Sequence, residues 1–403
     1  MSHDISSGTV KKRIVLHFSG FEPLDAAKHQ ARYQRSALKT AKLQDFAVKV
    51  GAVHADGPSR YFDVDSEGRD WQTKSRVYIF DHDDLVSYLN GRPTLSRIVG
   101  GFRSAARVVW EGGALAYFRH AWRFGLFFIF PFLLVSIGLA LSALIGTAPY
   151  WLALEPWLLL ASGPAAYLFF FKLFLPWSDR WHTLHLFADW ELAVAVATME
   201  KPYFKQWLED CLVSVRAALA EPADEYVISS HSMGSSIAAH VVGALVERDA
   251  SLLQGKRIVF ATLGGAILQC ALLRSADVLR SRVGAIARAR EVFWFDVQCL
   301  TDAINFYRCQ VVALAGHPTA PQPPIVFIRV KHLLSPERYR RIKRDFLRVH
   351  RQYVLDADVR ASFDFTMMTA GPLPAASFAN PAASSPRSIV AAPLQSQPSL
   401  RLN

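Results

Sequence analysis

The sequence predicts an α/β fold in which a mostly parallel sheet is flanked by helices and is interrupted along the chain by a helical hairpin. Three observations support this prediction. Short apolar runs with strand character alternate with helical patterns, and the apolar run at 227–231 passes abruptly into a helical pattern just after Ser232. Two long uncharged runs also separate the early strands from the later ones. Alternating strands and helices favour parallel strands joined by right-handed crossovers.

Length and charge limit the possible partners. The 403 residues are enough for one large or two ordinary domains, and the formal net charge is +11. No aromatic and basic nucleic-acid motif accompanies this charge, so we expect no nucleic acid and instead expect contact with anionic membrane lipid. The cysteines Cys211, Cys270, Cys299 and Cys309 show no C-x-x-C spacing. We therefore expect reduced, packed thiols, with neither a disulfide framework nor a zinc site.

The first 120 residues are expected to begin the sheet. An apolar run at 12–18 predicts a strand, and Ser19, Gly20 and Phe21 lie in the loop after it. The other expected elements are a helix at 24–44, strands at 46–53 and 76–80 with a polar hairpin region between them, and a helix from 94 onward. The segment 81–84 surrounds a histidine with acids. Because acids favour the first turn of a helix, we expect a strand end and a helix start there rather than a metal site.

Two uncharged runs predict a transmembrane helical hairpin. Residues 124–154 contain no Asp, Glu, Lys, Arg or His, and the run 156–171 is again uncharged. Since a membrane-spanning helix needs about 20 apolar residues, we expect spans near 125–146 and 157–177. Lys172 lies inside the second span, where a lysine near a helix end can extend to the lipid headgroups. The alternative is a hairpin buried inside a large soluble domain.

Basic residues flank the hairpin but are absent from its turn. Arg119 and Arg123 precede it and Arg180 follows it, whereas residues 146–151 contain no Lys or Arg. Because Lys and Arg accumulate on the cytoplasmic side, we expect a multi-pass protein of the inner (cytoplasmic) membrane with the sheet domain on the cytoplasmic side. The N-terminus lacks the apolar core of a signal peptide, so export of the sheet domain is not implied.

The chain after the hairpin returns to the alternating pattern. The expected elements are helical segments within 181–220, the strand at 227–231 with its helix, and strands at 256–263, 291–297 and 324–330 with helical material between them. Beyond Gly371 the composition turns to Pro, Ala and Ser, which predicts a disordered tail.

The segment Ser230-His231-Ser232-Met233-Gly234 lies where the central strand meets its helix. In so sharp a turn the middle serine takes a strained conformation and projects its hydroxyl above the sheet, and only small residues fit two positions away on either side. The segment resembles the nucleophile elbow of the α/β-hydrolase superfamily, particularly its lipase and esterase-like members, in which the first position is usually glycine. The resemblance predicts Ser232 as the nucleophile; alternatively, Ser232 caps the helix.

The resemblance also implies where the oxyanion hole lies. In this superfamily one backbone N–H comes from the residue after the nucleophile and another from a loop after an early strand. This nominates Met233 together with Gly20 or Phe21. The alternative for Gly20 and Phe21 is an ordinary turn after an edge strand.

The catalytic residues of this superfamily follow one another in the order serine, acid, histidine. Asp302 lies after a predicted strand in a loop similar to the acid loop of lipase-like relatives, although it could instead cap a helix. Asp296 competes with it but lies within the strand. Among the later histidines, His317 comes too early. His350 begins a His-x-x-Tyr pattern similar to the catalytic-histidine segment of membrane-associated hydrolases, and it is preferred to His332.

The resemblance and the hairpin together imply a membrane-anchored serine hydrolase that cleaves an ester of a lipid or another hydrophobic acyl compound. No metal or organic cofactor is required for this chemistry. The alternatives are a non-catalytic membrane-anchored scaffold with this fold, and an enzyme whose hairpin docks another membrane protein. The implied organisation is an α/β-hydrolase domain in two parts, 1–118 and 181–370, a hairpin at 119–180 and a tail at 371–403. The sequence does not indicate an oligomeric state.

Overall fold

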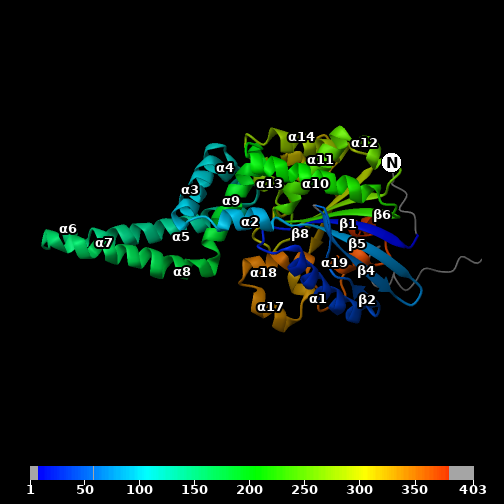
Figure 1. Ribbon diagram of the computed structural model, residues 1–403, viewed down its shortest axis with the longest axis horizontal. Coiled ribbons are helices and arrows are strands. Elements are labelled where there is room, and N and C mark those ends of the chain that lie inside the picture. Colours follow the sequence, from blue (N-terminus) through cyan, green and yellow to red (C-terminus); the bar gives the residue numbers. More distant parts are fainter. Residues whose placement is uncertain (1–7, 58, 381–403) are drawn as a thin grey trace, which may run out of the picture.

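The computed structural model describes residues 8–57 and 59–380, and its centre is a nine-stranded sheet (Figure 1). The strands are β1 (Lys12–Phe18), β2 (Ala47–Val50), β3 (His54–Asp56), β4 (Ser59–Glu67), β5 (Gln72–Phe80), β6 (Glu225–His231), β7 (Ile258–Leu263), β8 (Val292–Cys299) and β9 (Ile325–Ile328). Their order across the sheet is β2-β4-β5-β1-β6-β7-β8-β9, and β3 pairs with β4. β6 therefore lies in the interior of the sheet, between β1 and β7.

The sheet is mixed but mostly parallel. The strands from β5 to β9 along the sheet order run parallel, whereas β4 pairs antiparallel with β2, β3 and β5. The predicted α/β fold with a mostly parallel sheet flanked by helices is confirmed. The polar region predicted between two early strands is instead β3 and β4. β4 buries Phe62 and Val64 on one face but carries Asp63 and Asp65 on the other, and acids are depleted in strands.

Helices cover both faces of the sheet (Figure 1). They are α1 (Ala26–Gln44), α2 (Asp83–Asn90), α3 (Thr94–Trp110), α4 (Gly113–His120), α9 (Thr183–Thr198), α10 (Pro202–Ala220), α11 (Gly234–Arg248), α12 (Ala250–Leu253), α13 (Ile267–Ala271), α14 (Asp277–Arg288), α15 (Val311–Leu314), α16 (Val330–Leu333), α17 (Pro336–Ile342), α18 (Phe346–His350) and α19 (Phe365–Ala370). Alternate residues of β1 point to opposite faces. Ile14 and Leu16 join the core that includes α9, α10 and α11, whereas Val15 joins the core that includes α1 and α19.

The helical hairpin projects from the α/β body (Figure 1). Its outgoing arm is α5 (Trp122–Gly146), its turn contains α6 (Ala148–Trp151), and its returning arm comprises η1 (Pro156–Leu158), α7 (Leu159–Leu168), the π-helical η2 (Phe169–Phe174), α8 (Leu175–Ser178) and η3 (Asp179–Trp181). Both arms are long and apolar enough to cross a membrane, and only 28% and 17% of their most apolar stretches are buried. The alternative of a hairpin buried inside the domain is therefore wrong. Crossing of a membrane stays a prediction.

Residues 371–380, the first part of the predicted disordered tail, are instead packed against the sheet. Arg13 of β1 is fully buried, where a guanidinium requires several acceptors. It donates to Glu225 of β6 and to the carbonyl oxygens of Gly371 and Leu373 at 2.8 and 2.6 Å. This segment ends in η5 (Ala375–Ala379), where Phe378 is buried. The rest of the predicted tail, 381–403, lies outside the described residues.

Candidate active site

Ser232 occupies a strained turn between β6 and α11. Its φ is 54°, in the left-handed region that residues other than glycine rarely adopt. Backbone hydrogen bonds hold this conformation: the Ser232 N–H donates to the carbonyl of Leu263 at 3.3 Å, and the Ser232 carbonyl accepts from the N–H of Ala266 at 3.0 Å. β6 itself is buried throughout, whereas Ser232 is partly exposed. The partly exposed hydroxyl of Ser232 therefore lies at the carboxyl end of a buried strand.

The loop after β1 packs directly against this turn. A Cβ on Gly234 would lie 2.2 Å from the carbonyl oxygen of Ser19 and 2.4 Å from that of Phe18. Both neighbours are backbone atoms of an interior strand and its loop, so they cannot move aside cheaply. A Cβ on Gly20 would lie 3.2 Å from the Cβ of Ser232. The close approach therefore requires glycine at 234 and places Gly20 beside the serine.

Asp302 and His350 meet although they are distant in sequence. The Nδ1 of His350, at the end of α18, donates to Oδ2 of Asp302 at 2.7 Å. Tyr353 donates its hydroxyl to the same oxygen at 3.1 Å, and the backbone N–H of Ile304 donates to Oδ1 at 2.9 Å. The carboxylate acts only as an acceptor here, so the proton of the neutral imidazole lies on Nδ1 and the lone pair on Nε2. Within the described residues this buried Nε2 has no hydrogen-bond partner.

Ser232 and His350 line the same small cavity, of about 40 Å³. One wall is apolar and includes Phe127, from the base of the hairpin, and Leu347 of α18. His332 lies exposed on α16 and is not among the residues around this cavity. The structure therefore brings Ser232, Asp302 and His350 together and leaves His332 apart.

Asp296, the competing acid, is engaged elsewhere. It lies within β8, where Thr262 donates to Oδ1 at 2.6 Å and Gln298 donates to Oδ2 at 2.7 Å. Burial raises the pKa of Asp296 to about 6 against the opposing effect of these two donors. Its partners are side chains of the sheet, as expected for an acid that points into the packing of a strand.

His231 supports the histidine of the pair. Its Nε2 donates to the carbonyl of His350 at 2.9 Å, and the two rings lie 4.7 Å apart. Burial lowers the pKa of His231 to about 3, and the neighbouring His350 adds to this effect. His231 is therefore neutral near pH 7 and fixes the backbone from which the imidazole of His350 projects.

The predicted oxyanion donors lie beside the serine. Among residues 8–57 and 59–380, the backbone N–H groups of Gly20, Phe21 and Met233 make no hydrogen bond. Gly20 and Phe21 line the cavity, and Met233 directly follows Ser232. His185 fixes this loop because its ring stacks on Phe21 at 4.8 Å and its Nε2 donates to the Phe21 carbonyl at 3.1 Å. These N–H groups therefore have no acceptor within the described chain, and their role in an oxyanion hole stays a prediction.

Sequence reasoning misses six polar residues that line the cavity: Glu22, His185, Asp189, His231, Gln269 and Arg351. Asp189 of α9 accepts from Gln269 at 3.1 Å, and burial raises its pKa to about 6. Burial alone would raise the pKa of Glu22, but Arg32 and Arg351 outweigh it and the pKa falls to about 2. A signal for Asp189 exists in the sequence, since Asp189 and Glu191 are the two carboxylates of an otherwise largely apolar helical stretch. Glu22 and Gln269 give no comparable local signal.

The sequence also led to expectations about metal binding and about the cysteines. β5 ends at Phe80 and α2 begins at Asp83, so the acidic segment 81–84 is a strand end and a helix start, as predicted. No group of three or more His, Cys, Asp or Glu side chains suited to a metal is found in the part of the chain that the structure describes. All four cysteines are free and buried.

Comparison with protein-family models, with curated proteins and with solved structures found no match.

Proposed function

We propose that this protein is a membrane-anchored serine hydrolase of the α/β-hydrolase type that cleaves an ester through Ser232, Asp302 and His350. One observation carries the proposal: a strained serine at a strand-to-helix turn shares a cavity with an imidazole whose other nitrogen is bonded to a buried carboxylate. A nucleophile, a base and a group that orients the base are the parts that acyl transfer requires.

In this proposal His350 is the general base. Its Nε2 takes the proton of the Ser232 hydroxyl as the oxygen attacks the ester carbonyl, and Asp302 holds the tautomer and stabilises the imidazolium that forms. The N–H of Met233, with that of Gly20 or Phe21, donates to the developing oxyanion. The imidazolium then protonates the leaving alcohol. The same nitrogen then deprotonates a water molecule that attacks the acyl-serine carbonyl. The bond between the acyl carbon and the Ser232 oxygen breaks, and the imidazolium returns its proton to that oxygen as the acid leaves.

The hairpin supports a hydrophobic substrate. Its large apolar side chains are widely exposed, with Leu133 at 56%, Leu144 at 58% and Leu160 at 81%. At 1.5 Å per residue α5 is about 37 Å long, enough for the apolar core of a bilayer. Phe127, near its first turn, lines the cavity at Ser232. An ester in the outer part of a bilayer would therefore approach Ser232 at the base of the hairpin.

Side chains around this base suit a membrane surface. Trp110 of α3, Leu115 of α4 and Trp122 of α5 are 79%, 77% and 58% exposed. α3 and α4 lie beside the start of the hairpin (Figure 1). Tryptophan is enriched at the level of the lipid headgroups. With Arg119, Arg123 and Arg180 at the ends of the hairpin, this arrangement favours a cytoplasmic location of the α/β body.

One observation favours the scaffold as a second candidate. The cavity of about 40 Å³ has room for a water molecule but not for an ester, so Phe127 or Leu347 must move before a substrate binds. A protein that kept this fold without turnover would need no such movement.

Labelling by a fluorophosphonate separates the two candidates. We expect the full-length protein in detergent to form a covalent adduct at Ser232, identified by mass spectrometry, and Ser232→Ala to form none. Ser235→Ala is the matched control, because Ser235 lies one turn away with its hydroxyl buried and unpaired among the described residues. Folded protein that forms no adduct at Ser232 would leave the scaffold as the better account.

A further inference from the structure

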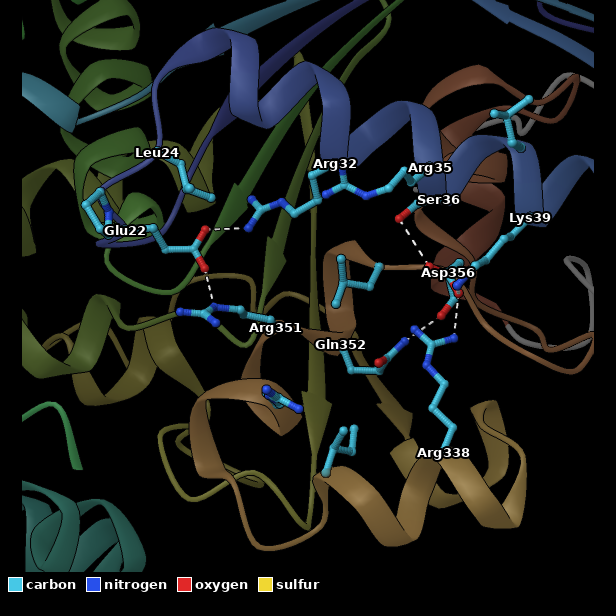
Figure 2. Close-up of a pocket in the computed structure, with 15 residues that line it drawn as sticks. Glu22, Leu24, Arg32, Arg35, Ser36, Lys39, Arg338, Arg351, Gln352 and Asp356 are labelled. Atoms are coloured by element: carbon cyan, nitrogen blue, oxygen red, sulfur yellow. Dashed lines mark hydrogen bonds and ion pairs between the residues drawn. The ribbon is translucent and has the colours of Figure 1, made fainter. Parts of the chain in front are cut away.

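A second and larger depression adjoins the candidate active site (Figure 2). Its volume is about 670 Å³, and it lies between α1 on one side and α17, α18 and η4 (Arg351–Val354) on the other. Six basic residues line it: Arg32, Arg35, Lys39, Arg338, Arg348 and Arg351. Two carboxylates, Glu22 and Asp356, also line it. We call this depression the cationic cleft.

Both carboxylates of the cationic cleft are already engaged (Figure 2). Glu22 forms ion pairs with Arg32, at 2.5 Å, and with Arg351. Asp356 forms ion pairs with Lys39 at 3.2 Å and with Arg338 at 2.5 Å. Each carboxylate thus faces two cations, and the cleft keeps an excess of positive charge.

Two arginines of the cationic cleft, Arg35 and Arg348, pair with neither of its carboxylates and are available to a ligand. In the described part of the chain Arg35 has no hydrogen bond or ion pair, and Arg348 pairs only with Asp345, at 3.2 Å on the surface of its own helix. Exposed ion pairs of this kind contribute only about 0–1 kcal/mol, so a ligand can displace Asp345 easily. Leu24 and Ile342 line the same cleft and exclude water on part of its surface. Reduced solvation strengthens the attraction between the guanidinium groups and an anion.

The cationic cleft adjoins the candidate active site and shares two lining residues with it. Glu22 and Arg351 line both the cleft and the cavity at Ser232. Glu22 follows Phe21, one of the predicted oxyanion residues, and Arg351 follows His350. A molecule with its carbonyl at Ser232 that also reaches the cleft must displace the ion pair between Glu22 and Arg351 or lie against it.

We propose that the cationic cleft binds the phosphate group of a phosphorylated ester whose carbonyl lies at Ser232. The proposal rests on the proposed hydrolase function and adds a substrate class to it. Arginine suits this role because its planar guanidinium donates two parallel hydrogen bonds to phosphate oxygens and keeps its charge at any physiological pH. The phosphate belongs either to a lipid headgroup or to a water-soluble ester, and both present the same dianionic or monoanionic group to Arg35 and Arg348.

The kinetic test compares two short-chain substrates, dibutyrylglycerol and dibutyrylglycerol phosphate, with the full-length protein in detergent. Loss of one charge-assisted bond costs about tenfold, so Arg35→Ala combined with Arg348→Ala should lower the ratio of kcat/KM for the phosphorylated over the neutral ester roughly a hundredfold. Lysine at both positions should retain part of the ratio. Arg340→Ala is the control, because Arg340 is a basic residue of α17 that is exposed and lies outside the cleft. An unchanged ratio in the double alanine variant overturns the proposal.

A binding test separates the cleft from the catalytic proposal. Calorimetry with full-length Ser232→Ala measures affinity for inorganic phosphate and for dibutyrylglycerol phosphate below its micellar concentration. Sedimentation with phosphatidic acid vesicles, compared with phosphatidylcholine vesicles, tests the lipid source. Binding that falls at least tenfold in the double alanine variant supports the cleft and identifies the source. Absence of such binding in all arms overturns it, whether or not Ser232 reacts with the fluorophosphonate.

Discussion

The α/β body and the hairpin contain the same kinds of apolar side chain but place them in opposite ways. In α11 every residue from Gly234 to Leu245 is buried. In the hairpin, Leu126, Leu133 and Leu144 of a single helix are each more than half exposed. Leaving a leucine in water forfeits about 1.5–3 kcal/mol relative to burying it. The body therefore completes its own packing, whereas the described chain leaves these apolar side chains of the hairpin uncovered.

The two regions meet at the base of α5. Phe124 packs against Phe306 with ring centroids 4.4 Å apart, and Phe127 packs edge to face against Phe346 at 5.8 Å. Phe306 follows the loop of Asp302, and Phe346 begins the helix that ends at His350. The comparison thus predicts a division of roles, with chemistry in the body and placement in the membrane by the hairpin. Contact between them extends along the first three turns of α5, where Phe132 also stacks on Phe187 of α9.

The largest expected effect concerns membrane association through the hairpin. Leu133, Ile137 and Leu141 are 56%, 47% and 43% exposed on α5. An arginine at the centre of a membrane helix costs about 3 kcal/mol, so replacing all three with Arg should cost roughly 9 kcal/mol in a bilayer and little in water. We expect the variant to leave the membrane fraction after an alkaline wash. Replacement of the same three by Ala is the control and should remain there. A triple arginine variant that stays with the membrane would remove the contrast between the two regions.

The second largest expected effect concerns the proposed catalytic acid in the α/β body. Asp302→Asn should lower kcat about 10⁴-fold, because the amide no longer accepts the Nδ1–H of His350 unambiguously and the wrong tautomer becomes stable. The measurement is ester hydrolysis by folded protein in detergent. Asp296→Asn is the matched control, since it removes a second buried carboxylate that belongs to β8 but does not contact His350. Equal losses in the two variants would mean that the Asp302 contact has no special role.

A third prediction compares two glycines. Gly234→Ala places a Cβ 2.2 Å from a backbone oxygen, whereas a Cβ on Gly146 in the hairpin would meet the Cβ of Ala166 at 3.4 Å, an ordinary van der Waals contact. Overpacking of the first kind costs about 3 kcal/mol, while an alanine in a helix is favoured over glycine by about 0.5–1 kcal/mol. We expect Gly234→Ala to lower the thermal midpoint in detergent and Gly146→Ala to leave it unchanged or raise it. The reverse order would contradict the packing described for the strand-to-helix turn.

The fold could be predicted from the sequence where the signal is local or periodic. Strands β1, β6, β7 and β8 each contain an apolar run of at least three residues. The turn at Ser232 is encoded within five residues. The order of residues along the chain then selected Asp302 and His350. β4 could not be found in this way, because its exposed face carries acids that favour loops. Glu22 forms an ion pair with Arg351, which lies far along the chain, and no local sequence pattern predicts such a contact.

The smallest expected effect is a loss of folding stability at acidic pH, and it is attributed to His240 of α11. Its Nε2 donates to the carbonyl of Val196 at 3.0 Å, and its Nδ1 accepts from Arg282 at 3.0 Å, so the ring is neutral when folded. Burial lowers its pKa to about 3, and the charge of Arg282 adds to this. In the unfolded chain the ring binds a proton below its ordinary pKa of about 6.5. This contribution to stability is therefore complete above pH 6.5 and is lost as the pH falls toward 3.

His240→Gln removes this titration while an amide keeps a donor and an acceptor at the same place. Between pH 7.5 and 5.5 we expect the native protein to lose about 1 kcal/mol more of its free energy of unfolding than the variant does. Denaturant midpoints in detergent at the two pH values give the measurement. Gly146→Ala is the control, because it introduces no titrating group, so any change in the midpoint should be the same at both pH values. A parallel loss of stability in the native protein and the variant would mean that this part of the acid sensitivity does not come from His240.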